Sequence, residues 1–77
     1  MKARIVSYPV FTKFRGEIRT GRTPHSRRSA EEQAQQIVLA HRSRDWSAEV
    51  RRSRQGQVNT ELLMRYWWDD GLQYLEY

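Results

Sequence analysis

Apolar and aromatic positions are densest in the last part of the chain, residues 61–77. A first apolar run, residues 62–68, leads through Asp69-Asp70-Gly71 into a second run, residues 72–77. An Asp-Gly step between two such runs is a strong β-hairpin signal, because tight hairpin turns need residues that tolerate positive φ. The pattern therefore predicts a terminal β-hairpin around which the rest of the chain is organised.

The turn of this hairpin can contain two or three residues. The two alternatives place each side chain of the return strand on opposite faces of the sheet. A two-residue loop at Asp70-Gly71 places Trp67 opposite Tyr74 and Arg65 opposite Glu76 on the solvent side. The core face then carries Leu62, Met64, Tyr66, Trp68, Leu75 and Tyr77. A three-residue loop with a bulge instead pairs Tyr66 with Tyr74.

The beginning of the chain has strand composition in residues 2–14, which are rich in β-branched and aromatic side chains. Pro9 interrupts this stretch, so the strand lies at a sheet edge or is bulged at Tyr8-Pro9. Arg15-Gly16 is a turn signal, and residues 17–20 form a short return strand in which Ile18 points inward. We expect a first hairpin here.

A helix is predicted from about residue 30 to residue 43. Ser29 with Glu32 three residues later makes a capping box, which places the N-cap at Ser29. An apolar stripe at helical spacing follows and would lie on the sheet: Ala30, Ala34, Ile37, Val38 and His41.

After the helix, Trp46, Ala48 and Val50 alternate with polar residues, which predicts a half-buried strand. A polar, Gly-containing turn at residues 51–57 then leads through Val58 into the terminal hairpin, so the arginines in that turn should be largely exposed. The predicted fold class is α+β: a curled antiparallel sheet of about five strands with one helix packed on it, in the order β-β-α-β-β-β. With 77 residues, the chain forms a single domain over residues 1–77.

Composition limits the cellular compartments in which this domain is expected. The chain has no cysteine, which excludes disulfides and thiolate chemistry and fits a reducing cytoplasm. No apolar run approaches the length of a membrane span, so no membrane association is expected.

Charge is unevenly distributed along the chain. Residues 1–28 contain eight Lys or Arg and one Glu, whereas residues 57–77 contain one Arg and four acidic residues, within a formal net charge of +5. Such an asymmetry suggests an anionic partner for the basic part, and ordinary solubility with self-complementary sheet ends explains it equally well. The stretch 21–28 reads either as a solvated connector or as an arginine loop that grips phosphate or an acidic surface.

Catalytic and metal-binding patterns are not found in the sequence. His25 lies in a polar loop and His41 at a helix end, and neither has a partner at a spacing typical of a catalytic triad or a metal site. Asp69-Asp70 resembles a carboxylate pair, but turn chemistry accounts for both residues. We therefore expect no enzyme activity, no catalytic residue, no metal and no cofactor.

A binding surface is better supported by the residue types. Trp67 and Tyr74 on the solvent side, with Arg65 beside them, need either a partner or a covering element such as the N-terminal hairpin. Aromatic and arginine side chains stack bases in single-strand binders and anchor protein–protein interfaces. The predicted partner-binding residues are these three together with six arginines of the polar stretches: Arg22, Arg27, Arg28, Arg51, Arg52 and Arg54.

The layout resembles that of small phage-encoded anti-CRISPR proteins that act on type I systems. The residues that carry the likeness are Lys2-Ala3 with the strand that follows, the helix at residues 29–40, and Tyr66-Trp67-Trp68-Asp69-Asp70-Gly71. The resemblance implies a non-enzymatic inhibitor that docks on a subunit of an RNA-guided surveillance complex (Cascade) and blocks target DNA, and it transfers no binding residue. We expect such a protein to act as a monomer.

Two other function classes fit the same residues. One is a small basic protein of phage or mobile-element origin that binds the phosphate backbone of DNA or RNA, and the other is a structural or toxin–antitoxin-type partner protein. Salt dependence separates the first from an inhibitor, because binding to bare DNA weakens steeply as counterions compete. An obligate oligomer would indicate the second.

Overall fold

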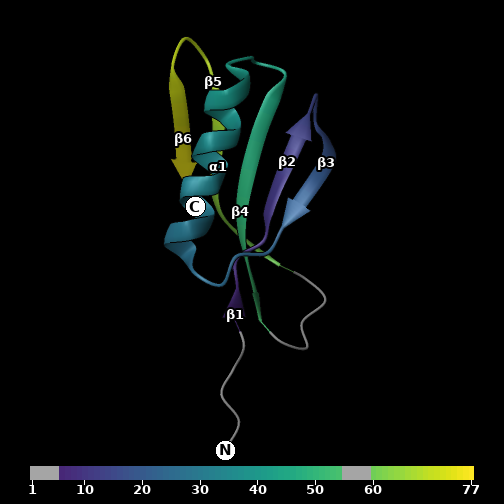
Figure 1. The fold of residues 1–77 in the computed structure, drawn as a ribbon, viewed down its shortest axis with the longest axis vertical. Coiled ribbons are helices and arrows are strands. Elements are labelled where there is room, and N and C mark those ends of the chain that lie inside the picture. The colour runs from purple at the N-terminus through teal and green to yellow at the C-terminus, as the bar shows by residue number, and fades with distance from the viewer. Residues whose placement is uncertain (1–5, 55–59) are drawn as a thin grey trace, which may run out of the picture.

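The computed structural model describes residues 6–54 and 60–77 and shows one α-helix packed on an antiparallel β-sheet (Figure 1). The elements follow in the order β1 (Val6–Ser7), β2 (Val10–Phe14), β3 (Glu17–Arg22), α1 (Arg27–His41), β4 (Trp46–Arg54), β5 (Glu61–Trp68) and β6 (Leu72–Glu76). The strand order across the sheet is β3-β2-β4-β5-β6, with β1 paired to β4. The sheet is not closed into a barrel, and the predicted α+β class and element order are confirmed.

The first strand is interrupted at Tyr8-Pro9 but keeps its register with β4. Val6 pairs with Arg54 in β1, and Val10 pairs with Val50 in β2. The pairing of β2 with β3 begins at Val10, one residue after Pro9. No β3 residue is therefore paired with Pro9, and the N–H that proline lacks is not needed for a ladder hydrogen bond there. The Tyr8 N–H donates to the carbonyl oxygen of Pro24 at 2.8 Å instead of joining a ladder.

The terminal hairpin has the three-residue loop. Tyr66 pairs with Tyr74 and Trp68 with Leu72, which leaves residues 69–71 in the loop with Asp70 at φ 55° and Gly71 at φ 138°. The alternative with a two-residue loop was wrong, and so was its arrangement of the return strand. Leu75 and Tyr77 lie on the side away from α1, whereas Tyr74 lies on the α1 side.

The helix begins three residues earlier than predicted. Ser26 is the N-cap, and its side-chain oxygen accepts a hydrogen bond from the Ser29 N–H at 3.1 Å. Arg27 and Arg28 are therefore helical, and they pair with Glu31 and Glu32 one turn later. The capping box at Ser29 was the wrong choice between two serines three residues apart, because either one can accept from an N–H at the start of a helix.

Substitution of each serine in turn tests which of the two caps the helix. We expect Ser26→Ala to lower the free energy of unfolding by about 1 kcal/mol, since it leaves a helix N–H without its acceptor. Ser29→Ala should cost less, because the Ser29 hydroxyl only accepts a 3.3 Å bond from the side chain of Gln33. Urea unfolding of both variants checks this expectation, and equal losses would contradict it.

The core lies between α1 and the central strands. The apolar stripe of the helix is confirmed in part: Ala30, Ala34 and Val38 are fully buried and Ile37 is half-buried, whereas His41 is exposed. The small alanine side chains let the helix approach the sheet closely, where it meets buried strand residues, of which alternation had assigned Ala48, Val50, Met64 and Tyr66 to the core. These buried strand residues are Val10, Ala48, Val50, Met64 and Tyr66. Leu63, which alternation along β5 places on the opposite side from Met64, is also buried, next to the register shift between Val50 and Arg51.

Two polar stretches have more structure than the sequence indicated. Gly21 and Arg22 complete β3, and Arg27 and Arg28 begin α1, so the predicted loop at 21–28 shortens to residues 23–26. Arg51, Arg52 and Arg54 belong to β4 rather than to a turn. The predicted strand residues 2–5 and the turn and strand residues 55–58 lie outside the described residues.

Candidate binding surface

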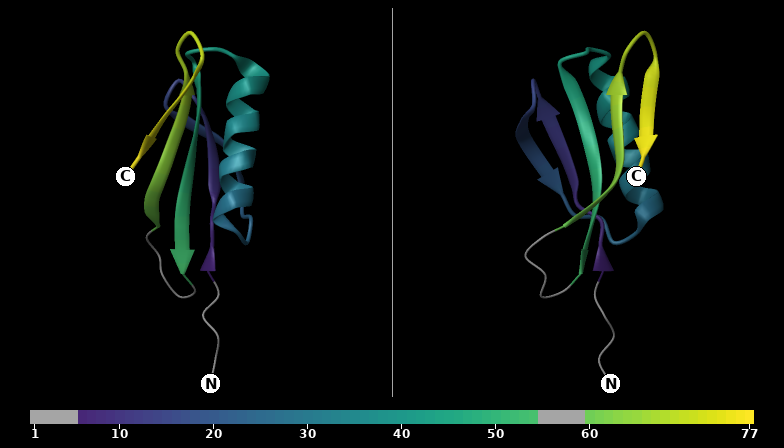
Figure 2. Two further views of the ribbon diagram at one scale, coloured as in Figure 1. Left: turned by 90° about the vertical axis from the view of Figure 1, so that its left-hand side faces the viewer. Right: turned by 180° about the vertical axis from the view of Figure 1, so that it is seen from behind.

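One face of the sheet is covered by α1, and no element in residues 6–54 and 60–77 covers the other face (Figure 2). We call this uncovered side the open face. Strand register and alternation place on it side chains from all five principal strands: Phe11, Lys13, Ile18, Glu49, Arg65, Trp67, Leu75 and Tyr77. Ile18, predicted to point inward, is 61% exposed here, and the N-terminal hairpin does not wrap over Trp67.

A buried carboxylate forms the centre of the open face. Glu49 is only 7% exposed, and its oxygens lie 2.9 Å from Lys13 Nζ and 3.1 Å from Arg51 Nη2. Burial opposes ionisation of this carboxyl, but the hydrogen bonds and charges of Lys13 and Arg51 outweigh burial and lower its pKa. Glu49 is therefore an ionised structural group that ties β2 to β4.

Arg65 and Trp67 form a cation–π pair on β5. The guanidinium carbon of Arg65 lies 5.7 Å from the centre of the Trp67 ring. Arg65 is opposite Glu49 in the register, but Lys13 and Arg51 occupy the carboxylate oxygens. The exposed Arg65 side chain is thus held over an aromatic ring, and it forms no ion pair with the residues that the structure describes.

A cleft of 440 Å³ lies beside this pair, at the end of the open face where the β2–β3 turn and the α1–β4 connection meet. Its walls combine cationic, acidic and aromatic groups: Lys13, Arg15, Arg44, Asp45, Glu49, Arg65 and Trp67. Arg15 pairs with Asp45 at 3.5 Å, and Arg44 pairs with Asp69 at 2.8 Å. These ion pairs link the α1–β4 connection to the β2–β3 turn on one side and to the β5–β6 loop on the other.

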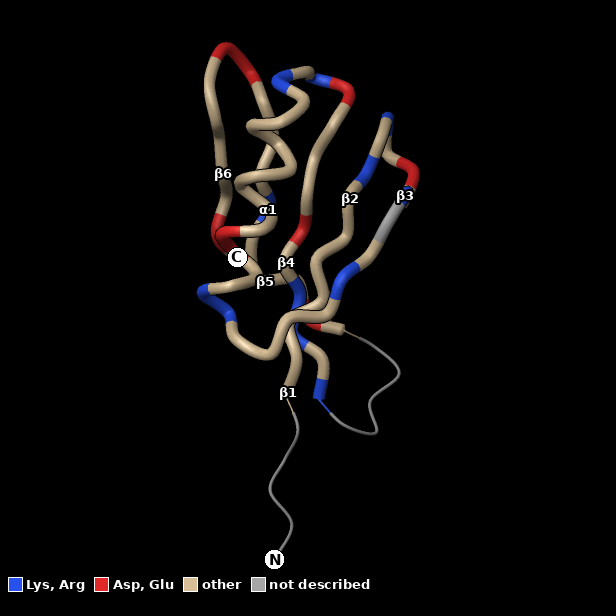
Figure 3. Tube along the Cα trace, viewed as in Figure 1, with Lys and Arg blue, Asp and Glu red and all other residues tan. Residues whose placement is uncertain are grey.

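The predicted partner-binding arginines do not gather in one place (Figure 3). Arg22 ends β3, Arg27 and Arg28 begin α1 on the helix side, and Arg51, Arg52 and Arg54 follow one another in β4. Arg51 and Arg52 are half-buried rather than largely exposed, because Arg51 binds Glu49 and Arg52 binds Glu61. The Arg52 hydrogen bond lowers the pKa of Glu61.

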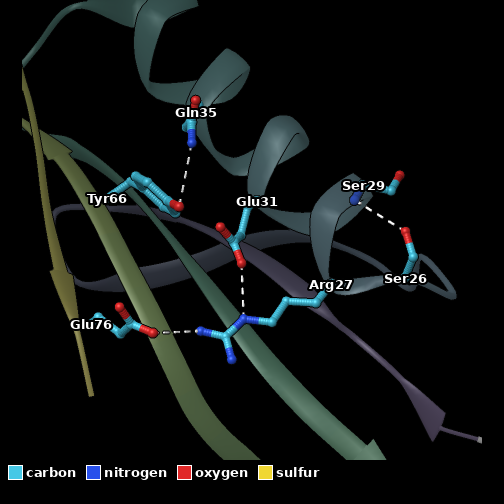
Figure 4. A network of polar contacts seen from close by, with 7 residues as sticks. All are labelled: Ser26, Arg27, Ser29, Glu31, Gln35, Tyr66 and Glu76. Carbon is cyan, nitrogen blue, oxygen red and sulfur yellow. Dashed lines mark hydrogen bonds and ion pairs between the residues drawn. The ribbon is translucent and has the colours of Figure 1, made fainter.

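Tyr74 is also separated from Trp67, contrary to the arrangement expected from the shorter loop. It lies on the α1 side with its ring centre 6.2 Å from that of Tyr66. There it lines a hollow beside the network in Figure 4, in which Arg27 bridges Glu31 at 2.9 Å and Glu76 at 3.1 Å. The hydrogen bond from Arg27 to Glu31 is the main cause that raises the pKa of this guanidinium.

The same network reaches the buried Tyr66. Gln35 Nε2 donates to the Tyr66 hydroxyl oxygen at 3.4 Å, and burial raises the pKa of that hydroxyl (Figure 4). Arg27 and Tyr66 thus connect the helix to the last two strands. Among the predicted partner-binding residues, Arg65 and Trp67 are brought together on the open face, where Arg51 also lies, half-buried and bound to Glu49.

A second hollow, a groove of 620 Å³, lies on the helix side between α1 and the β2–β3 hairpin. Arg19 and Arg22 line its β3 side, and neither forms an ion pair within the described ranges. Trp46 closes one end, with the His41 ring stacked on it at a centroid distance of 3.8 Å. His41 is therefore a packing residue at the border of the helix.

In residues 6–54 and 60–77, no three His, Asp or Glu side chains converge as ligands for a metal ion. No helix in this part of the chain is long and apolar enough to cross a membrane.

Sequence reasoning missed several residues of the open face. Alternation placed Glu49 on the polar side of its strand, but nothing in the sequence showed that Lys13 would lie beside it. Leu75 and Tyr77 were assigned to the core because the loop length was ambiguous. The three-residue loop was the signal that would have placed both on the open face.

Comparison of the chain with protein-family models, curated proteins and solved structures gives no match. The resemblance to anti-CRISPR proteins stays a prediction.

Proposed function

We propose that this chain is a non-enzymatic binding protein that docks on a partner protein through its open face. The observation that carries the proposal is the Arg65–Trp67 pair on an uncovered sheet face whose two edges expose Ile18, Leu75 and Tyr77. Tryptophan, tyrosine and arginine are the residues most enriched at the energetic centres of protein interfaces. Because the Trp67 ring already holds the Arg65 guanidinium in place, little side-chain freedom is lost on binding.

Following the resemblance, the partner is a subunit of a type I RNA-guided surveillance complex in the host cytoplasm. Docking on that subunit would block target-DNA binding by steric exclusion. The choice of this partner is supported by the likeness of the element order and of the aromatic hairpin. The open face adds a surface with the aromatic and arginine side chains that are common at protein interfaces.

The distribution of positive charge favours a protein partner over bare nucleic acid. Within residues 6–54 and 60–77, seven basic side chains are engaged in ion pairs with carboxylates: Lys13, Arg15, Arg27, Arg28, Arg44, Arg51 and Arg52. Affinity for the phosphate backbone grows with the number of cations that neutralise phosphates. Internal neutralisation therefore weakens the case for the alternative, a small basic nucleic-acid-binding protein. The observation that favours this alternative is the groove lined by Arg19 and Arg22.

A capture experiment tests the proposal. Tagged protein is pulled down from the lysate of cells that express a type I surveillance complex, and a parallel sample of the lysate is treated with nuclease. We expect nuclease-resistant capture of the complex, reduced about tenfold or more by Arg65→Glu because the charge reversal falls at the centre of the surface. Arg28→Glu is the matched control, since Arg28 lies on the helix side and its side chain is 92% exposed.

Four outcomes would contradict this proposal. Capture that disappears with nuclease would indicate nucleic acid, as would tight binding to bare DNA that weakens steeply between low and moderate salt. Equal loss of capture in Arg65→Glu and Arg28→Glu would indicate a general charge effect. Absence of any captured complex would leave the type I partner without support.

A further inference from the structure

The two edges of the sheet differ in how they are protected. The edge strand β3 carries charged residues, a glycine and a register shift opposite Thr12 and Lys13. The edge strand β6 has the sequence Leu-Gln-Tyr-Leu-Glu, with no Lys, Arg or Pro, and its five pairs with β5 follow without a shift. Charges, prolines and bulges are what soluble proteins use to prevent an edge from pairing with another chain. Of these devices β6 has only the charge of Glu76.

At every second residue of β6, the backbone N–H and C=O groups point away from β5, toward the free edge of the sheet. The Tyr77 N–H donates to the Leu63 carbonyl oxygen at 3.0 Å. In an antiparallel pair such bonds recur at every second residue, so Gln73, Leu75 and Tyr77 direct their groups toward β5. The N–H and C=O groups of Leu72, Tyr74 and Glu76 consequently point away from the sheet.

Exposed apolar surface is concentrated along this same edge. Of the four large hydrophobic side chains that are exposed in the described residues, three belong to positions 74–77. Tyr74 is 65% exposed on the α1 side, whereas Leu75 and Tyr77 are 49% and 59% exposed on the open face. A strand added to β6 would therefore contact apolar side chains on both faces of the sheet.

We propose that β6 pairs antiparallel with β6 of a second copy of this chain, about a two-fold axis at Tyr74. This register is the one that matches all three outward residues of each copy, with Tyr74 opposite Tyr74 and Leu72 opposite Glu76. On the open face, Gln73 lies opposite Leu75, and Tyr77 lies opposite Gly71, which has no side chain to obstruct the ring. The register places no two like charges opposite each other, and Arg27 holds the Glu76 carboxylate at 3.1 Å.

Self-pairing in this register has a defined geometry. A two-fold axis through a continuous sheet runs perpendicular to it, so both helices lie on one side and both open faces on the other. The dimer thus presents two copies of the Arg65–Trp67 pair on one continuous surface. It differs from the monomer that the sequence suggested, and it does not depend on the proposed partner.

Sedimentation velocity of the isolated protein over micromolar to millimolar concentrations tests the pairing. We expect a reversible monomer–dimer equilibrium that Tyr74→Lys weakens about tenfold or more, because it places two like charges opposite each other on the axis. The fold should persist, since Tyr74 is exposed and its backbone groups do not join the β5 ladder. Ile18→Lys is the matched control: it adds the same charge at an exposed apolar residue of the opposite edge strand, and should leave the equilibrium unchanged.

Cysteine cross-linking tests the register itself, because the chain has no cysteine of its own. A mixture of the Gln73→Cys and Leu75→Cys variants should form disulfide-linked dimers faster than either variant alone. A protein that is monomeric at every concentration would overturn the proposal. Dimerisation that Ile18→Lys abolishes and Tyr74→Lys does not, or equal cross-linking in all three samples, would overturn it as well.

Discussion

Tyr66→Ala is expected to lower the free energy of unfolding by about 3 to 5 kcal/mol, as truncation of a large buried ring usually does. Tyr66 is 2% exposed at the centre of the core, between Ala48 on β4 and Tyr74 on β6 in the sheet and beneath α1. A chain of 77 residues has a total stability of about 4 to 12 kcal/mol. The variant should therefore be largely unfolded at moderate urea concentration, and loss of far-UV circular dichroism measures this.

Tyr66→Phe is the control that separates the ring from its hydroxyl. It keeps the packing and removes only the acceptor of the 3.4 Å bond from Gln35. The expected cost is about 0.5 to 1.5 kcal/mol, because a single side-chain hydrogen bond is lost. If both variants lost the same stability, the hydroxyl network rather than packing would hold β5 to the helix.

Lys13→Met is expected to cost about 2 kcal/mol at pH 7, because it leaves the buried Glu49 carboxylate with only one of its two cations. Adding Glu49→Leu to Lys13→Met should restore part of the loss, since the buried charge is then removed together with its partner. Urea unfolding of the two single variants and the double variant gives the coupling energy between the residues. Additive losses would show that the 2.9 Å ion pair contributes nothing.

The same pair predicts a pH dependence with a definite sign. The pKa of Glu49 is lowered in the folded protein from its ordinary value of 4.5, so its contribution to stability is present above that value. The contribution is lost as pH falls through the lower folded pKa. The stability difference between the wild type and Lys13→Met should therefore shrink between pH 7 and pH 3, and a difference that is constant over this range would contradict the role of Glu49.

The fold could be predicted from the sequence because its signals are local. The stripe of Ala30, Ala34 and Val38 and the alternation of Trp46, Ala48 and Val50 each specify which side faces the core. The errors arose where one residue type serves two roles. Ser26 and Ser29 are both good caps, and Asp69, Asp70 and Gly71 fit both loop lengths.

The candidate surface was less predictable because it depends on which strands become neighbours. Arg65 and Trp67 were found since they are two residues apart on one strand. Lys13 and Glu49 come from strands separated by the whole helix, and their contact follows only from the pairing of β2 with β4. The ion pairs that occupy Arg27, Arg51 and Arg52 could not be inferred from charge counts for the same reason.

Along one strand, residues that pack in the core alternate with residues that face the proposed binding surface. In β5, Met64 and Tyr66 pack in the core, while Arg65 between them and Trp67 after them face outward. Because adjacent side chains point to opposite sides, an exchange at an outward position leaves the core contacts of its neighbours intact. Exposed positions of the open face outside the Lys13–Glu49–Arg51 cluster are therefore free to diversify in sequence without a corresponding change in the scaffold, so that variants of this small domain can acquire new specificities by single substitutions.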